Sequence, residues 1–168
     1  MIDQDLGEAM KEGMRRLASG VCVLSTKNHL GDRFAMTASS VTSVSDSPAS
    51  LLVCVNKETS MYRVLEEGGG FCINVLAHHH EPISSCCASG EQGESRFLKG
   101  HWRNGGEADL PYLQGALATF FCVQDQSFLY GTHKIIIGRI SEVLVGAGPV
   151  EPLIYLNGSY HRLYTQSV

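Results

Sequence analysis

Apolar and polar residues alternate in short runs along most of the chain, and this pattern predicts more strands than helices. The first segment is an exception. Its apolar residues recur every three or four positions, at Leu6, Met10, Met14 and Leu17. That period is typical of an amphipathic helix, expected over residues 5–19 with Asp5 as its N-cap and Gly20 at its end. Two shorter helices are expected over residues 60–67 and 78–88.

The predicted strands are short and are separated by Gly, Pro and Asn. They fall at residues 21–26, 34–45, 50–55, 71–76, 116–125, 127–130, 133–145 and 153–157. Between residues 89 and 106 the chain is polar and Gly-rich, with a turn expected at Asn104-Gly105. The pattern predicts one domain over residues 1–168 that is mainly antiparallel β with a few flanking helices. By itself it favours a closed barrel.

Composition narrows the class of protein. Only 18% of the 168 residues are charged, which indicates that a partner subunit covers part of the surface. The net charge of -4 and the absence of a basic face argue against a nucleic-acid partner. No apolar run approaches the ~20 residues that span a bilayer, and the acidic start Met1–Asp5 does not resemble a signal peptide. We therefore expect no membrane association and a cytoplasmic location.

The cysteines and the three consecutive histidines raise the question of disulfides or a metal site, but their spacing favours neither. Four of the six cysteines, Cys22, Cys54, Cys72 and Cys122, lie in apolar strand-like runs, where reduced thiols behave as small hydrophobes. His78-His79-His80 raises the possibility of a metal-binding regulator. Adjacent residues on a helix point about 100° apart, so this triplet alone does not converge on one ion, and we expect no metal site.

Two segments suit an anion such as phosphate, and the first also suits the edge of a heterocycle. Residues 36–45 are dense in Ser and Thr, which are small donors beside closely approachable backbone. This density is equally typical of an edge strand. In residues 56–60, Lys57 and Ser60 follow a buried strand and precede a helix, an arrangement that suits an anion or an ordinary cap. The phosphate-loop, serine-hydrolase and zinc-protease motifs are absent.

The order of segments along nearly the whole chain resembles the short-chain flavin reductase family, the FMN-binding split-barrel reductases. The matching segments are residues 14–21, 36–45, 52–56, 70–76, 131–138, 152–155 and 158–163. This resemblance implies an antiparallel Greek-key split barrel with a few flanking helices. It also implies a homodimer with flavin bound near the subunit interface.

The resemblance assigns flavin-binding roles to particular positions. Thr37, Ala38, Ser39 and Ser40 would line the flavin ring and ribityl chain. Cys54, Val55 and Asn56 would present backbone and an amide. Ser60 and Met61 would meet the phosphate, with Lys57 nearby and Arg96 as a phosphate-binding arginine. Ser45, His133, Tyr155 and Tyr160 match positions near the nicotinamide nucleotide.

The implied activity is hydride transfer from NADH or NADPH to FMN or FAD, and the reduced flavin would pass to a partner oxygenase. Such a reaction needs orientation more than acid–base chemistry, because the cofactors carry the reactive groups. His133 is the catalytic candidate, as a donor to the nicotinamide amide or to a nucleotide phosphate. The family often has Asp where this chain has Thr132, which leaves as an alternative a flavin-binding module without significant NAD(P)H turnover.

Overall fold

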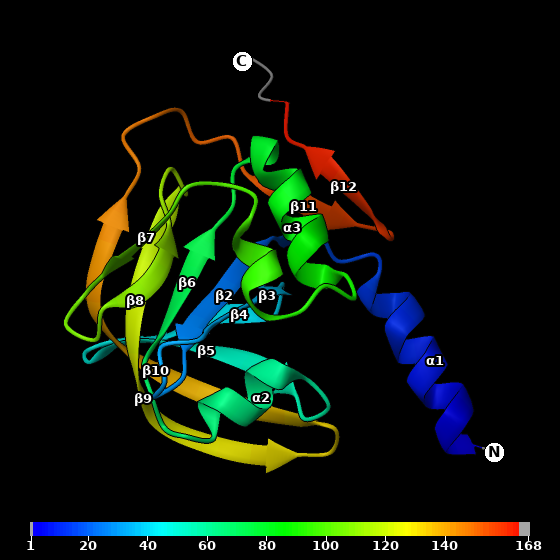
Figure 1. The fold of residues 1–168 in the computed structure, drawn as a ribbon. Coiled ribbons are helices and arrows are strands. Elements are labelled where there is room, and N and C mark those ends of the chain that lie inside the picture. Colours follow the sequence, from blue (N-terminus) through cyan, green and yellow to red (C-terminus); the bar gives the residue numbers. More distant parts are fainter. Residues whose placement is uncertain (1, 165–168) are drawn as a thin grey trace.

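The computed structural model of the protein describes residues 2–164, with side chains from residue 5 onward. The helices are α1 (Ile2–Met14), α2 (Ser60–Leu65) and α3 (Glu81–Ala88), with two short 3₁₀ helices, η1 (His78–His80) and η2 (Gly93–Phe97). The strands are β1 (Ser19–Gly20), β2 (Cys22–Lys27), β3 (Arg33–Ala38), β4 (Val41–Asp46), β5 (Ala49–Asn56), β6 (Phe71–Val75), β7 (Trp102–Gly105), β8 (Leu110–Leu113), β9 (Ala118–Tyr130), β10 (His133–Val145), β11 (Leu153–Leu156) and β12 (Ser159–Arg162). Figure 1 shows the strands wrapped around a common interior, with α2 and α3 packed against them.

The main sheet has seven strands in the order β3-β2-β6-β9-β10-β5-β4, and all neighbours are antiparallel. Within residues 2–164, its edge strands β3 and β4 do not pair with each other; only the residues between them, Ser39 and Ser40, join the two edges. The barrel is therefore split, as the family resemblance implies. The closed barrel that the pattern alone favoured is wrong, because a two-residue connection turns β4 toward β5 and away from β3.

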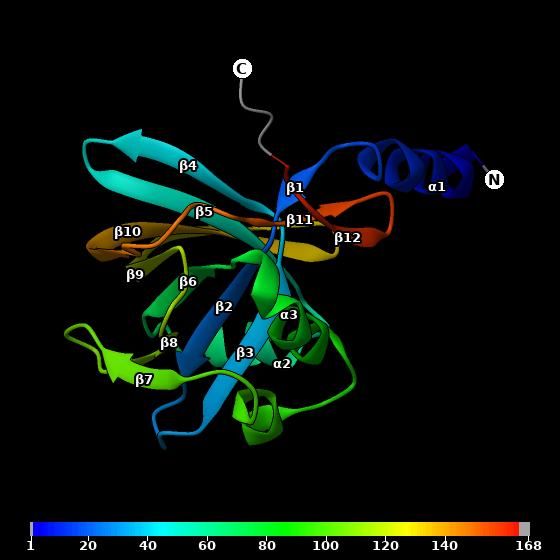
Figure 2. The ribbon, with the colours of Figure 1, turned by 90° about the horizontal axis from the view of Figure 1, so that it is seen from above.

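Two small sheets complete the fold. β1, β11 and β12 form one, and β7 pairs with β8 in the other. In Figure 2 the β11–β12 hairpin lies beside α3, above the ends of β2 and β3. β12 was not predicted, although Asn157-Gly158 before it has positive φ at both residues, as a two-residue hairpin turn requires. Asn104 and Gly105 belong to β7, so the turn starts two residues later than predicted, at Gly106.

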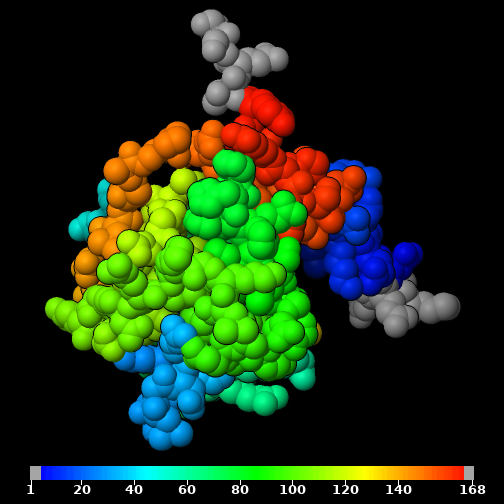
Figure 3. Space-filling model, turned by 45° about the horizontal axis from the view of Figure 1, so that its top comes forward, coloured from blue at the N-terminus to red at the C-terminus, as the bar shows by residue number. Residues whose placement is uncertain are grey.

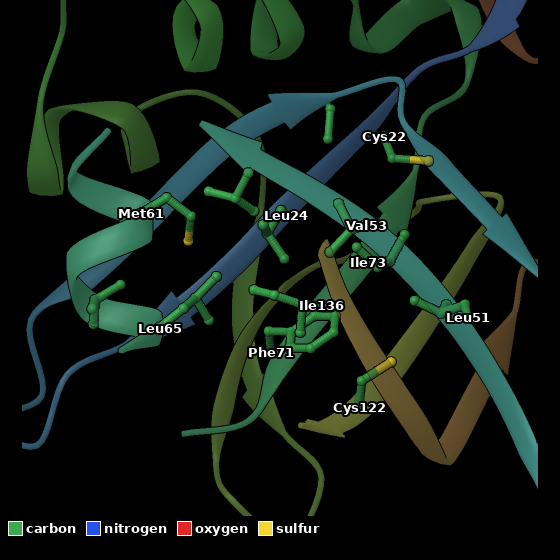
Figure 4. Close-up of a cluster of buried hydrophobic side chains, with 13 residues drawn as sticks. Cys22, Leu24, Leu51, Val53, Met61, Leu65, Phe71, Ile73, Cys122 and Ile136 are labelled. Atoms are coloured by element: carbon green, nitrogen blue, oxygen red, sulfur yellow. The ribbon is translucent and has the colours of Figure 1, made fainter. Parts of the chain in front are cut away.

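The main core lies between the sheet and α2 (Figure 4). Met61 and Leu65 on α2 reach the same cluster as Phe71 on β6, which is fully buried. Gly138 on β10 makes room for the Phe71 ring: a Cβ there would lie 2.6 Å from Phe71 Cζ and 2.9 Å from the Cys122 Cβ. The position therefore requires glycine because the ring and the strand are in direct contact.

Most predicted strands are confirmed within a few residues. The run over residues 34–45 is two strands, β3 and β4, whereas the runs 116–125 and 127–130 are one long strand, β9. The irregularity in between is a register shift opposite Ile137/Gly138. All six cysteines are free, in agreement with the prediction of reduced thiols. None of the described helices is long and apolar enough to cross a membrane.

The N-terminal helix differs from its prediction. It already includes Ile2, so Asp5 is not its N-cap, and it ends at Met14 instead of Ser19. The ending has a physical cause, because Ser19 and Gly20 pair with Tyr155 and Ile154 of β11 and must be extended. α1 points away from the barrel in Figure 2. Its apolar stripe faces solvent in the single chain: Leu6 is 67% exposed and Met10 58%.

Candidate functional site

A cavity of about 420 Å³ opens where the start of α2 faces β3 and the end of α3. Four residues that the resemblance assigned to flavin line it: Thr37, Ser60, Met61 and Arg96. The other lining residues are Met36, Glu58, Thr59, Cys87, Ala88, Ser89 and Gln92. The fold thus brings together residues that are far apart in the sequence, in a space bordered largely by polar groups.

The short segment between β5 and α2, which borders this cavity, is held in place by capping hydrogen bonds. Thr59 is the N-cap of α2: its Oγ1 accepts from the Tyr62 N–H at 3.2 Å and donates to the Asn56 carbonyl at 2.7 Å. The Asn56 side-chain oxygen accepts from the Glu58 N–H at 2.9 Å. The hydroxyl of Ser60 has no part in these capping bonds, although it lines the same cavity. The Thr59 cap was missed, but Thr directly before a helical pattern is a sequence signal for it.

Arg96 binds the backbone on three sides. Its Nε, Nη1 and Nη2 donate to the carbonyls of Glu91, Ala35 and Ser89 at 2.6, 2.6 and 2.8 Å. These bonds fasten the segment after α3 to β3. No ion pair among residues 5–164 includes Arg96, so its positive charge is not neutralised by a carboxylate. The side chain therefore shapes the cavity wall and gives the cavity a positive charge.

The segment from Thr37 to Ser40 runs from this cavity to the open seam between β3 and β4. The Ala38 side chain is buried in the core, and Ser39 is exposed. Ser40 joins the seam to β5, because its Oγ accepts from the Cys54 N–H at 3.2 Å and donates to the Cys54 carbonyl at 3.1 Å. Val55 is fully buried, so its side chain is not available to a ligand.

His133 lies at the start of β10, opposite Asn56 in the antiparallel ladder, and is exposed. Its Nδ1 lies 2.8 Å from the hydroxyl of Thr132. The Thr132 carbonyl accepts from the Lys57 N–H at 3.0 Å, which fixes this corner against β5. A hydroxyl thus contacts His133 from the position where the family often has Asp.

Tyr155 and Tyr160 face each other across β11 and β12, with ring centroids 5.4 Å apart and planes at 65°. The Tyr160 hydroxyl is 2.7 Å from Ser84 Oγ on α3, and the Ser84 carbonyl accepts from Thr37 Oγ1 at 2.6 Å. The tyrosine pair is therefore connected to the cavity through α3. Ser84 was not predicted, and a serine within a helical pattern gives no signal for such contacts.

Ser45 does not join the other predicted residues within one chain. It pairs with Ser50 near the far end of β5, whereas Cys54 is four residues further along the same strand. At about 3.3 Å per residue the separation is about 13 Å. Ser45 is exposed, and its Oγ accepts from the Ser47 N–H at 3.1 Å.

The donor set of the cavity fits the phosphate end of a flavin. Arg96 supplies charge, and the hydroxyl of Ser60 supplies a donor of the type that phosphate oxygens accept, whereas the Ser89 hydroxyl already donates to the Cys86 carbonyl at 2.7 Å. Glu58, an exposed residue of the same lining, carries a negative charge that opposes the positive charge of Arg96. Burial raises the pKa of the Cys87 thiol to about 12, with a smaller contribution from Cys86, so this cavity residue stays a protonated thiol.

The histidine triplet is placed differently from a metal centre. His80 is buried, and its Nδ1 accepts from the Ala77 N–H at 3.1 Å, so the ring ties η1 to the preceding residue. His78 Nδ1 lies 3.3 Å from a Glu151 carboxylate oxygen. Among the described residues, no group of three or more His, Cys, Asp or Glu is arranged to hold a metal ion.

Comparisons with known proteins identify relatives of this chain that act on flavin. A family model for the flavin reductase like domain matches residues 14–164. An FMN reductase (NADH) RutF from Agrobacterium fabrum is 37% identical over 153 residues, which cover 91% of this chain and 86% of that protein.

Solved structures are also similar. BorF, the flavin reductase component of a bacterial two-component tryptophan halogenase, is 28% identical with a TM-score of 0.85, over 95% of this chain and 99% of that chain. The NADH:FAD oxidoreductase SgcE6 of Streptomyces globisporus C-1027, in complex with NAD and FAD fragments, is 26% identical with a TM-score of 0.86, over 95% and 93%. The protein therefore belongs to the flavin reductase like domain family.

Proposed function

We propose that the protein is an NADH-dependent flavin reductase that supplies reduced flavin to a partner oxygenase. Its family membership supports the reaction class. The observation that carries the proposal within the chain is the cavity, in which Thr37, Ser60, Met61 and Arg96 come together. BorF is named as the flavin reductase component of a two-component halogenase, and the structure from Pseudomonas putida S12 is named as the flavin reductase of a styrene monooxygenase; both names support a separate acceptor.

In this proposal the flavin phosphate lies in the cavity, against Arg96, Ser60 and the backbone at Met61, with Lys57 nearby. The ring and ribityl chain follow the seam from Thr37, Ala38 and Ser39 to Ser40, which Cys54, Val55 and Asn56 border on β5. The bonds between Ser40 and Cys54 hold the two sides of this seam in register. The single phosphate of FMN fits this one anion-binding cavity; FAD would extend beyond it.

NADH is proposed to contact His133, at the start of β10, and Tyr155 and Tyr160, on the β11–β12 hairpin, which lies at the other end of the barrel in one chain (Figure 1). The bound flavin supplies the acceptor for the hydride. His133, held through Nδ1 by Thr132, offers its other nitrogen to the nicotinamide amide or to a nucleotide phosphate. The tyrosine pair would present an aromatic surface that orients the nicotinamide ring. We propose NADPH as an alternative hydride donor at the same site.

We further propose that the protein is a homodimer and acts in the cytoplasm. The exposed stripe of α1 supports the dimer, because an amphipathic helix whose apolar side faces water gains by covering it. Within one chain Ser45 lies apart from the other site residues. In the dimer it would contribute to the nucleotide site of the second copy. Six free cysteines fit a reducing compartment.

The deciding experiment is steady-state oxidation of NADH by the purified protein with and without FMN. Oxidation that rises and saturates with FMN supports a reductase. FMN binding without oxidation of NADH or NADPH would instead favour the flavin-binding module, and Thr132→Asp would then be the first variant to assay. The contact of Thr132 with His133 leads us to expect turnover without that change.

The assignment of the seam is tested separately by flavin affinity. Ser39 is exposed, so Ser39→Trp is expected to fold normally and to weaken FMN binding at least tenfold by filling the seam. Ser43→Trp, on the exposed face of β4, is the matched control and should bind FMN like the wild type. Equal FMN affinity in the two variants would contradict this placement of the flavin ring.

A further inference from the structure

Ser84 is a fully buried polar residue on α3 that contacts two different parts of the proposed site. Its carbonyl accepts the Thr37 hydroxyl at 2.6 Å. Its own hydroxyl is 2.7 Å from the Tyr160 hydroxyl. Thr37 belongs to the proposed flavin site and Tyr160 to the proposed nicotinamide site.

No sheet joins these two sites directly. β3, which carries Thr37, is an edge of the seven-stranded sheet, and β12, which carries Tyr160, is an edge of the three-stranded sheet. α3 lies against both, and Figure 3 shows the green segment that contains α3 beside the red β11–β12 hairpin. The hairpin is joined to the main sheet by backbone bonds, such as the Val21 N–H to the Leu153 carbonyl at 3.1 Å, and α3 adds a second connection that links Tyr160 to Thr37 of β3.

The hydroxyl of Ser84 could have been satisfied inside its own helix, since serine commonly donates to the carbonyl four residues earlier. It instead reaches across to Tyr160. Tyr160 in turn packs edge-on against Tyr155, so one hydrogen bond sets the tilt of both rings. Removing it leaves the helix intact and the hairpin paired with β1, but it frees the Tyr160 ring to shift against α3.

We propose that Ser84 is a positioning residue that fixes the spacing between the nicotinamide and flavin sites. The inference rests on the proposed function. It assigns Ser84 no contact with either cofactor; the residue acts through Thr37 and Tyr160. Hydride transfer depends on ring separation, so a shift of the Tyr160 ring would lower productive NADH binding before it affected the flavin.

Ser84→Ala is the primary test. It removes the bond to Tyr160, keeps the carbonyl for Thr37, and places a better helix former in α3. We expect the KM and the dissociation constant for NADH to rise about fivefold, as for the loss of one hydrogen bond, with the FMN dissociation constant within twofold of wild type. Tyr160→Phe should reproduce this effect. The double variant should be no worse than either single one, because both remove the same bond.

Ser85→Ala is the matched control, since Ser85 is its exposed neighbour on the same helix. Parallel losses of NADH and FMN affinity, additive effects in the double variant, or an unchanged NADH constant would each overturn the positioning role. If the wild-type protein does not reduce flavin, the proposed function fails. The NADH dissociation constants of the same variants then decide the role of Ser84, and absence of NADH binding to the wild type would overturn it.

Discussion

The barrel interior and the α1 helix are both built on regular apolar periods, yet they end in opposite environments. On β6, Phe71 and Ile73 are fully buried between the sheet and α2. On α1, the equally regular stripe of Leu6, Met10 and Met14 is more than half exposed. An apolar period therefore indicates which face seeks burial, but the partner that covers it can lie in the same chain or in another.

This difference separates two kinds of stability. The barrel should keep its fold at any protein concentration, since its contacts are within the chain. α1 contributes only when something covers it, so its contribution should depend on concentration. The variants below, from the largest expected effect to the smallest, are chosen to break or sharpen this distinction.

Phe71→Ala should have the largest effect. The ring fills the space above Gly138, so its loss leaves a cavity and should lower the free energy of unfolding by about 3–5 kcal/mol. Leu6→Ala, its counterpart on α1, should change that free energy by less than about 0.5 kcal/mol at a concentration where the chain is monomeric. Urea unfolding of both variants measures the contrast, and similar losses would show that α1 is part of the barrel's cooperative unit.

Leu6→Glu combined with Met10→Glu should disrupt association and leave the barrel folded. Charges on this stripe oppose burial in a dimer, and we expect the dimer dissociation constant to rise about 100-fold or more. Light scattering across a dilution series gives the mass, and circular dichroism reports the fold. Lys11→Gln on the polar face is the control. An unchanged dimer would place the interface elsewhere.

Asn74→Ala tests how much a buried polar side chain contributes to the stability of the barrel interior. Asn74 is fully buried, donates to the Val23 carbonyl at 2.9 Å and accepts from the Leu113 N–H at 2.8 Å. Its removal leaves buried backbone groups unpaired, so we expect a loss of about 2 kcal/mol in urea unfolding. Asn104→Ala on exposed β7 should be close to neutral. A neutral Asn74→Ala would mean that water replaces the lost bonds.

The last effect, a pH dependence from His80, is absent at neutral pH and develops only as the pH falls. Burial, and then the charges of His79 and His78, lower its pKa from 6.5 to about 4. The unfolded chain therefore binds a proton that the folded one does not, and stability contributed by neutral His80 is lost as pH falls from about 6.5 to about 4. His80→Asn should flatten the unfolding free energy across this window, whereas exposed His101→Asn should not. An identical slope in both variants would assign the effect to other groups.

The fold was largely predictable because strand periods and turn residues are local signals. The long runs over residues 50–55, 71–76 and 133–145 became β5, β6 and β10 with small changes at their ends. The start of β1 was not predictable in the same way. Its two residues are extended only because β11, far along the chain, pairs with them.

The candidate site was predictable in part, and through the family resemblance more than through chemistry. Residue patterns alone left Lys57 and Ser60 as either a cap or an anion site. The position of Ser84 depends on contacts with residues 47 positions before and 76 after it, and no local pattern encodes such distances. Ser45 matched the family but lies apart from the other residues in one chain, a separation that only the register of β4 with β5 reveals.

The split in the barrel also bears on solubility. A sheet with two open edges offers unpaired backbone groups that invite strands of other molecules. Here each edge is protected in its own way: η2 and the Arg96 bond to the Ala35 carbonyl cover β3, while a register shift between Ser43 and Ser45 interrupts β4. The open seam that we propose for flavin can thus persist without turning the protein into a template for aggregation.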